Sequence, residues 1–534
     1  MATKTARRRR NHRGWGYEDE VLSEDAMREA APGIAEHLGF GSTDIESPVP
    51  LEAAELPELR VEPPAALKDI CTQDTHARAS HAYGKGYRDV VRAFRGRFDH
   101  APDLVATPRD ERQVELVLEW AGGAGVAVIP YGGGTSVVGG VEPRLSGKYA
   151  GAVTLDLSML AGVLEVDPVS RAARIQGGAS GPALEAQLAE HGFTLRHFPQ
   201  SFELSTLGGW IATRAGGHFA TLYTHIDDLV ESVRAITPTG TWESRRLPGS
   251  GAGPSPDRML IGSEGILGVI TEAWVRVIPK PTHRASAGVR FERFEDGAEA
   301  VRAIAQAGLY PANCRLIDAR EARTTFAGDG SSHLLVLGFE SADHPVDAWL
   351  ERALAICGEN AGSWDEVKSA GREGPVGAWR DAFLRAPYLR DTLVAMGVFS
   401  ETFETAITWD RFPAFHKKVT EAVEEALREH CGAGTVTCRF THVYPDGPAP
   451  YYTMLAPARR GHELDQWDAL KCAASDAVIA AGGTITHHHA VGRDHRPWYD
   501  RQRPEPFAAA LRAAKAALDP AGILNPGVLI DPLR

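Results

Sequence analysis

The chain has 534 residues and a formal net charge of −13, and 43% of its residues are hydrophobic and 24% charged. A chain of this length exceeds the size of a single hydrophobic core, which predicts two or more domains, and its acidic balance argues against general binding to nucleic acid. The six cysteines form no CxxC pair and no zinc-like spacing, and no stretch approaches the roughly 20 apolar residues that cross a bilayer, so the sequence indicates a cytoplasmic protein with reduced thiols.

The first 99 residues are charged and interrupted by prolines, which is typical of an N-terminal extension. One helix is expected there, from about Glu24 to Leu38. The basic run from Arg7 to Arg10 precedes this helix. Because no apolar segment follows the run, it does not match a secretion signal.

A second helix is expected to begin at Thr107, with Thr107 as the N-cap, Pro108 in the first turn and acidic residues after it. We expect this helix to run to Trp120 and to end at the glycine pair 122–123.

The following segments have strand composition and strand length: 126–129, 153–157, 172–176, 230–237 and 269–278. An Ala/Leu-rich helix is expected between residues 181 and 191. From about residue 282 strand and helix segments alternate, which indicates a second, substrate-facing domain. The predicted division is an N-terminal extension (1–99), a cofactor-binding domain (100–281), a substrate-binding domain (282–494) and a C-terminal segment that packs back on the cofactor-binding domain (495–534).

A glycine loop follows the strand at 126–129. Its residues are Pro130, Tyr131, Gly132, Gly133, Gly134, Thr135 and Ser136. Adjacent glycines let backbone N–H groups converge on an anion without obstruction by Cβ atoms, which suits a pyrophosphate. The loop lacks the GxGxxG spacing of a Rossmann site and the lysine of a GxxxxGK loop, so on its own an ordinary glycine-rich turn explains it equally well.

Two more segments are rich in small and hydroxyl residues. The first, 199–217, includes a helix start at which Ser205 or Thr206 is the expected N-cap. The second, 262–272, is a glycine-punctuated turn that enters a strand. Neither segment is diagnostic alone.

The order and spacing of these segments resemble the FAD-binding domain of the vanillyl-alcohol-oxidase/p-cresol-methylhydroxylase superfamily. Within it, the chain resembles the alkyldihydroxyacetonephosphate synthase family over nearly its whole length. The matching motifs are Trp15 to Tyr17, Gly208 to Arg214, Tyr388 to Asp391, Ser400 to Thr405 and the tract His487, His488, His489. The three histidines are the most specific, because related flavin 2-hydroxy-acid dehydrogenases usually have Gly-Glu-His-Gly at that place.

The resemblance implies an α+β fold with a two-subdomain, PCMH-type FAD-binding domain, a cap domain with an antiparallel sheet flanked by helices, and an N-terminal helical extension. It implies that FAD contacts Pro130, Tyr131, Gly132, Gly133, Gly134, Thr135, Ser136, Pro199, Gln200, Ser201, Phe202, Glu203, Leu204, Ser205, Ala212, Thr213, Arg214, Ala215, Glu264, Gly265, Ile266, Leu267, Gly268, Val269 and Ile270. We expect FAD to be bound non-covalently, because the glycine loop contains no histidine. His218, in a segment that superficially resembles an attachment motif, departs from the family's usual residue.

The resemblance gives catalytic roles to Tyr451 and to at least one of His487, His488 and His489, which would remove a proton from C1 of acyl-dihydroxyacetone phosphate. Imidazole and phenol groups suit proton transfer. A metal site is not expected, because adjacent residues on a strand point to opposite faces. The residues alone allow two alternatives: the three histidines are a surface run, and Tyr451 is an aromatic residue that packs on a strand face.

Arg390 matches the family's substrate-contacting arginine, and Arg315 lies in an apolar, strand-like run where an unpaired charge is costly. The planar fork of an arginine suits a phosphate dianion. Without the resemblance, both are ordinary ion-pair residues.

The leading hypothesis is an FAD-dependent transferase that exchanges the acyl group of acyl-dihydroxyacetone phosphate for a long-chain alcohol without net redox change. The alternatives are an FAD-dependent 2-hydroxy-acid dehydrogenase or oxidase, and an inactive flavin-binding protein. Lipid substrates imply peripheral contact with a membrane, at its inner face, and the family suggests a homodimer.

Overall fold

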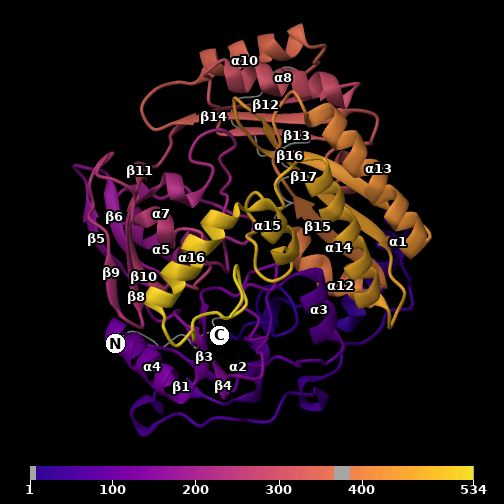
Figure 1. The fold of residues 1–534 in the computed structure, drawn as a ribbon. Helices are drawn as coiled ribbons and strands as arrows, with labels where there is room; N and C mark the ends of the chain where they lie inside the picture. The colour runs from indigo at the N-terminus through magenta and orange to yellow at the C-terminus, as the bar shows by residue number, and fades with distance from the viewer. Residues whose placement is uncertain (1–7, 366–384, 533–534) are drawn as a thin grey trace.

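The computed structural model describes residues 8–365 and 385–532, and Arg7 of the basic run lies outside them. The described chain forms two halves, each built around sheets (Figure 1). The half at the bottom and left contains the strands from β1 to β11, and the half at the top and right contains the strands from β12 to β17. The predicted α+β class is confirmed.

A four-stranded sheet carries the glycine loop. Its order is β1 (Cys71–Thr72), β2 (Leu104–Ala106), β4 (Gly151–Asp156), β3 (Val126–Tyr131), and β2, β4 and β3 are parallel. β3 is apolar and buried on both faces, as parallel strands usually are. The glycine loop therefore leaves the carboxyl end of a rigid buried strand.

A five-stranded antiparallel sheet lies beside it, in the order β5 (Val163–Asp167), β6 (Ala172–Gln176), β10 (Val269–Arg276), β8 (Val230–Thr237), β9 (Gly240–Glu243). The helices α5 (Gly181–Ala189) and α6 (Leu207–Thr213) bury their apolar residues against it. β7 (Phe193–Thr194) and β11 (Ile278–Pro279) form a small separate ladder.

The second half is a six-stranded antiparallel sheet with helices on one face. Its order is β12 (His283–Phe291), β14 (His333–Ser341), β13 (Asn313–Ile317), β16 (Thr435–Val443), β17 (Pro448–Pro457), β15 (Val398–Glu404). The covering helices are α8 (Phe294–Gln306), α10 (Asp347–Glu359), α13 (Phe412–Cys431) and α14 (Glu463–Ala480). Their apolar faces and the sheet share one core, so the other sheet face is free to line a site.

Both ends of the chain return to distant parts of the fold. α1 (Glu24–Leu38) buries Met27 and Ala31 in the core of the six-stranded sheet. Near the C-terminus, after α15 (Arg496–Gln502) and α16 (Glu505–Leu518), the backbone pairs with β3, where Asn525 N–H donates to the Val128 carbonyl at 2.9 Å. The remaining described helices of at least four residues are α2 (Thr75–Ser80), α3 (Tyr87–Phe94), α4 (Glu111–Ala124), α7 (Asp257–Leu260), α9 (Ala319–Thr324), η5 (Ala386–Leu389) and α12 (Arg390–Ala395). Among the described helices, none is both long enough and apolar enough to span a bilayer.

The expected bounds of the helix after Thr107 are wrong. The helix is α4 (Glu111–Ala124), and its N-cap is Asp110, whose carboxylate accepts from Gln113 N–H at 2.8 Å. It continues through the glycine pair 122–123 and ends at Gly125, which has a φ of 66°. A glycine can be accommodated inside a helix at a modest cost, whereas the left-handed end position strongly favours it.

Candidate active site

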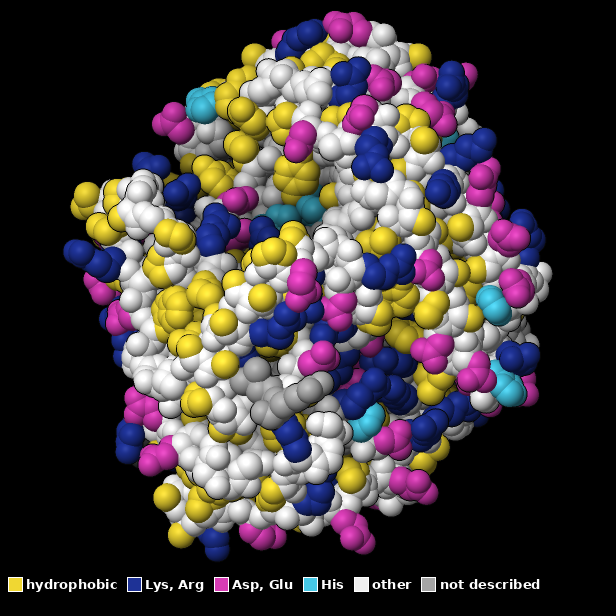
Figure 2. Space-filling model, viewed as in Figure 1, with side chains coloured by type: hydrophobic (Ala, Val, Ile, Leu, Met, Phe, Trp, Pro, Cys, Tyr) yellow, Lys and Arg dark blue, Asp and Glu magenta, His cyan; other side chains and the backbone are white. Residues whose placement is uncertain are grey.

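One cavity of about 850 Å³ lies between the two halves. The glycine loop, α6 and the turn before β10 line one end, and the helix-free face of the six-stranded sheet lines the other. In the space-filling view a hollow opens there, and histidine side chains are visible in its depth (Figure 2). A cavity of this size is within the range of ligand and cofactor sites.

The cavity brings together most of the residues expected to contact FAD. Those that line it are Pro130, Gly132, Gly133, Gly134, Thr135, Ser136, Pro199, Gln200, Ser201, Ser205, Ala212, Thr213, Ala215, Glu264, Gly265, Gly268 and Ile270. Those that do not line it are Tyr131, Phe202, Glu203, Leu204, Arg214, Ile266, Leu267 and Val269. Several residues of the second set instead support the cavity walls from behind. For example, the Arg214 guanidinium pairs with Asp227 at 2.9 Å.

The glycine loop approaches the segment 199–206 so closely that it has no room for side chains. A Cβ atom on Gly133 would lie 2.0 Å from the Leu204 carbonyl oxygen, and one on Gly132 would lie 2.2 Å from the Thr206 hydroxyl. Thr206 is the N-cap of α6, so one of the two expected caps is confirmed. The loop and the start of α6 therefore form one cradle whose surface is backbone, as the approach of a phosphate group requires.

Glu264 connects this cradle to the histidine tract. Its buried carboxylate accepts from the N–H groups of Val491 and Gly492 at 2.9 and 2.8 Å. Burial raises the pKa of Glu264 to about 7, and the two N–H groups act in the opposite direction. The turn before β10 and the chain after His489 are thereby held together.

Three strands place Glu404, Tyr451 and Arg439 in one row. Tyr451 on β17 is the register partner of Glu404 on β15 and of Arg439 on β16. Cross-strand partners point to the same sheet face, and here this face lines the cavity. The Arg439 guanidinium lies 3.9 Å from the centre of the Tyr451 ring. Tyr452 points the other way, and its hydroxyl is 3.0 Å from His416 Nδ1 under the helices.

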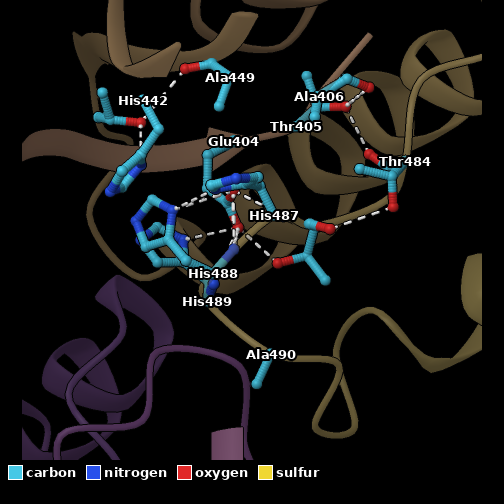
Figure 3. A network of polar contacts seen from close by, with 12 residues as sticks. Glu404, Thr405, Ala406, His442, Ala449, Thr484, His487, His488, His489 and Ala490 are labelled. Atoms are coloured by element: carbon cyan, nitrogen blue, oxygen red, sulfur yellow. Dashed lines mark hydrogen bonds and ion pairs between the residues drawn. The ribbon is translucent and has the colours of Figure 1, made fainter. Parts of the chain in front are cut away.

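The carboxylate of Glu404 holds the backbone of the histidine tract (Figure 3). It accepts from the N–H groups of His487 at 2.7 Å, His488 at 3.1 Å and His489 at 2.9 Å, and from the Thr486 hydroxyl. Burial opposes its ionisation, but the histidines and the Thr486 hydroxyl hold the pKa of Glu404 well below its ordinary value. A single buried carboxylate thus fixes three consecutive residues.

The three histidines do not share one environment. His488 and His489 line the cavity, whereas His487 Nε2 bonds the Tyr444 hydroxyl at 2.7 Å behind it. Burial lowers the pKa of His488 to about 3 and that of His489 to about 4, and Glu404 acts in the opposite direction. Both imidazoles are neutral at pH 7 and able to accept a proton.

His442 on β16 adds a fourth imidazole from outside the tract. Its Nε2 lies 3.1 Å from the Gly217 carbonyl oxygen. One ring nitrogen each of His442, His487 and His488 lie within 4.8 Å of one another. Adjacent positions on a strand were expected to separate the tract's side chains, but the tract is a loop, so that argument does not apply to it.

The arginines Arg315, Arg390 and Arg439 make this end of the cavity basic. Arg315 is fully buried, and burial lowers its pKa to about 9, with Arg439 acting in the same direction. Arg439 is paired with Glu321 at 2.6 Å, and Arg390 donates to the Lys85 carbonyl at 2.8 Å. Three guanidinium groups around one buried space favour a ligand with more than one negative charge.

The cavity continues from the arginines to an apolar end. This end is lined by Ile34 and Leu38 of α1 and by Phe326, Leu389 and Leu393. Phe326 is 69% exposed and Leu389 is 41% exposed, so this end opens to the surface. A ligand that fills the whole cavity therefore has a charged part and an apolar part.

Several lining residues had no signal in the sequence. The lining residues Arg439 and His442 lie on β16, whose register a single sequence does not reveal. The lining residues of α1 precede Phe326 and Leu389, the other residues of the apolar end, by hundreds of positions in the sequence. Glu404 belongs to the matching motif Ser400 to Thr405, but the sequence assigned no role to its side chain.

Two family models match the chain: "FAD binding domain" over residues 102–244 and "FAD linked oxidases, C-terminal domain" over residues 280–529. The chain is 31% identical to the alkyldihydroxyacetonephosphate synthase of Dictyostelium discoideum, over 88% of this chain and 80% of that protein. It is 29% identical to the enzyme of the same name from Trypanosoma brucei brucei, over 87% and 79%. A solved alkyldihydroxyacetonephosphate synthase structure matches with a TM-score of 0.82 and 26% identity, covering 97% of this chain and 98% of that one.

Proposed function

Because the chain belongs to the alkyldihydroxyacetonephosphate synthase family, we propose that it is an FAD-dependent transferase that makes an ether lipid precursor from acyl-dihydroxyacetone phosphate and a long-chain alcohol. The C1–oxygen bond to the acyl group breaks, the fatty acid leaves, and the alcohol oxygen bonds to C1. No net oxidation occurs. One observation carries the proposal: a single cavity joins a dinucleotide cradle, a basic pocket with proton-transfer groups, and an open apolar end.

FAD fits the cradle made by residues 130–136, 199–206 and 264–270, whose glycines leave room only for backbone. When bound, FAD supplies an electron-accepting ring system that stabilises negative charge on a neighbouring substrate carbon. We infer non-covalent binding, since His218 is not among the residues that line the cavity. Intact-mass measurement of the denatured protein tests this inference, and a retained flavin mass contradicts it.

The side chains then have separable roles. Arg315, Arg390 and Arg439 bind the phosphate dianion, whose charge strengthens the neighbouring imidazoles as bases. His488 or His489 removes the C1 proton, and Tyr451 acts as an acid or base on the exchanging oxygen. Glu404 keeps the histidines in place, and the closed basic end keeps water from competing with the alcohol.

The deciding experiment supplies palmitoyl-dihydroxyacetone phosphate and hexadecanol to the purified protein and detects the ether product by mass spectrometry. Equal amounts of ether and palmitate are expected. Anaerobic mixing with D-lactate or glycolate tests the alternative oxidation of a hydroxy acid. Lasting loss of the oxidised flavin spectrum with a hydroxy acid, together with no ether product, would refute the proposal.

We predict that Gly133→Ala abolishes stable FAD binding. The new Cβ would lie 2.0 Å from the Leu204 carbonyl oxygen and 2.7 Å from Ser205 Cα, so the loop must move off the segment that completes the cradle. The ratio of flavin to protein absorbance after gel filtration measures the loss. Gly122→Ala in α4 is the control, because nothing beyond its own stretch of helix lies within 4 Å of its Cβ position, and it should retain full flavin content.

Arg390→Lys is expected to raise the KM for the acylated ketose phosphate by roughly tenfold or more with little change in kcat, because an ammonium group cannot form two parallel bonds to a phosphate. Steady-state kinetics with varied phosphate substrate measures the effect. Arg352→Lys, at an exposed arginine paired with Glu359, should leave KM unchanged. An unaltered KM for Arg390→Lys would remove this arginine from the phosphate site.

We also propose that the protein is a homodimer, which light scattering would test.

We propose further that the exposed apolar end of the cavity, here called its mouth, contacts a membrane surface. Phe326→Asp is expected to reduce flotation with phosphatidylcholine liposomes, because it places a charge at the exposed mouth. Val169→Asp is the control: Val169 is 92% exposed but lies at the β5–β6 turn. Equal flotation of both variants contradicts contact through this mouth.

A further inference from the structure

The N-terminal segment 8–20 lies against the glycine loop. The Arg10 guanidinium donates to the Gly133 carbonyl at 2.6 Å, and the Trp15 indole N–H donates to the Lys85 carbonyl at 3.3 Å. The Asn11 amide donates to the Asp391 carboxylate at 3.2 Å. Trp15 itself lines the cavity. Whatever fixes this segment therefore also fixes one wall of the cofactor cradle.

His12, Glu18 and His76 converge at the outer side of this segment. Glu18 Oε1 lies 3.0 Å from His76 Nε2 and 3.7 Å from His12 Nδ1, and all three atoms lie within 4.8 Å of one another. Ligand atoms of a tetrahedral Zn²⁺ site with bonds of about 2.0–2.1 Å are roughly 3.3 Å apart. Two of the three spacings thus bracket the required distance, and the third is at most 4.8 Å.

The hydrogen bonding of the two histidines leaves them able to bind a metal. His12 Nδ1 is buried and has no hydrogen-bond partner in the described part of the chain. His76 Nε2 lies 3.1 Å from the Arg10 carbonyl oxygen and 3.0 Å from the Glu18 carboxylate, which both accept, so this nitrogen carries a proton that a metal ion would displace on binding. The Arg10 carbonyl oxygen, 3.1 Å from His76 Nε2, is within reach as a fourth ligand.

We infer that His12, His76 and Glu18 form a site for Zn²⁺ or a similar divalent transition metal, which fastens the segment 8–20 to α2. Two imidazoles and one carboxylate are the ligand set of many zinc sites, whereas Mg²⁺ and Ca²⁺ prefer oxygen ligands. The ligands lie on a different part of the fold from Tyr451 and the histidine tract, so the role of the metal is structural.

The test uses the full-length FAD-loaded protein after treatment with a chelator. Titration with Co²⁺, followed at wavelengths beyond the flavin bands, should give the visible spectrum of a tetrahedral site with one equivalent bound, and Zn²⁺ should displace it. His12→Gln and Glu18→Gln are each expected to weaken Zn²⁺ binding by about 100-fold or more, since even the loss of an outer partner of a ligand costs about 10- to 100-fold. The Glu18 side chain is 37% exposed and lies in a short 3-10 turn, so its substitution carries less risk to folding than that of a buried histidine.

His487→Gln is the matched control, because His442, His487 and His488 form the other described group of ligand atoms within 4.8 Å. It should bind Co²⁺ and Zn²⁺ as the unaltered protein does. Binding lost in His487→Gln but kept in His12→Gln would place the metal at the histidine tract and overturn the inference. No saturable binding at one equivalent would overturn it as well.

Discussion

Replacing Tyr451 with phenylalanine is expected to lower kcat for ether formation by about 10²- to 10⁴-fold, the range that positioned acid–base groups contribute. The substitution removes only the hydroxyl. The ring can still pack under the Arg439 guanidinium, which lies 3.9 Å from its centre. Burial raises the pKa of Tyr451 while Arg439 acts in the opposite direction, so the group is a neutral phenol at pH 7 that Arg439 makes easier to ionise. FAD content and KM should change little.

Tyr452→Phe is the control for this prediction. It removes a hydroxyl from the adjacent residue, which faces the core and bonds His416. The loss of that hydrogen bond should lower stability by about 1 kcal/mol without a large change in kcat. A Tyr451→Phe enzyme with nearly normal kcat would show that the hydroxyl takes no part in the reaction.

Glu404→Gln is expected to lower kcat by about 100-fold, because a displacement of about 1 Å at a reacting group has an effect of this size. A glutamine has one acceptor oxygen, and its amide nitrogen would face a backbone N–H of the tract. A buried N–H without an acceptor costs about 1–3 kcal/mol, so the tract should shift to relieve it. Single-turnover and steady-state kinetics measure the loss, and thermal unfolding measures the change in stability.

The pH dependence separates this positioning role from a general loss of stability. Glu404 raises the pKa values of His488 and His489, so its removal should move the acidic limb of the kcat profile to lower pH. Glu401→Gln is the control, since this buried carboxylate on the same strand bonds the Trp467 indole away from the cavity. Glu401→Gln should lower stability but leave the pH profile in place. The same shift in both variants would contradict a specific role for Glu404.

Local patterns predicted individual elements well. The helix expected near Glu24 to Leu38 is α1 with those bounds, and the segments 172–176 and 230–237 are β6 and β8. Such segments can be recognised from the periodicity of their apolar residues and from the turn residues that flank them. The start of α4 was wrong because two capping residues, Thr107 and Asp110, precede the same helix, and only tertiary packing decides between them.

The site was predictable only in part, for a physical reason. The cofactor cradle consists of contiguous segments whose glycines leave a signal in the sequence. The row of Glu404, Tyr451 and Arg439 depends on the register of three strands, and a shift of one residue would turn each side chain to the opposite face. The family resemblance supplied Tyr451 and the histidines, but nothing in the sequence pointed to Arg439 or to the function of Glu404.

The packing of α1 also has a consequence for how the protein is made. The Ser42 and Glu46 N–H groups, just after α1, donate to the carbonyls of Met396 and Ala395 at 2.8 and 2.9 Å, so the N-terminal region completes its contacts with residues about 350 positions later in the chain. During synthesis at about 5–20 residues per second, the apolar side of α1 remains uncovered for roughly tens of seconds, until the residues that pack against it have been made. The nascent chain is therefore exposed to aggregation at its N-terminus, where binding by a chaperone would protect it most. Folding is complete only after the last strands have left the ribosome.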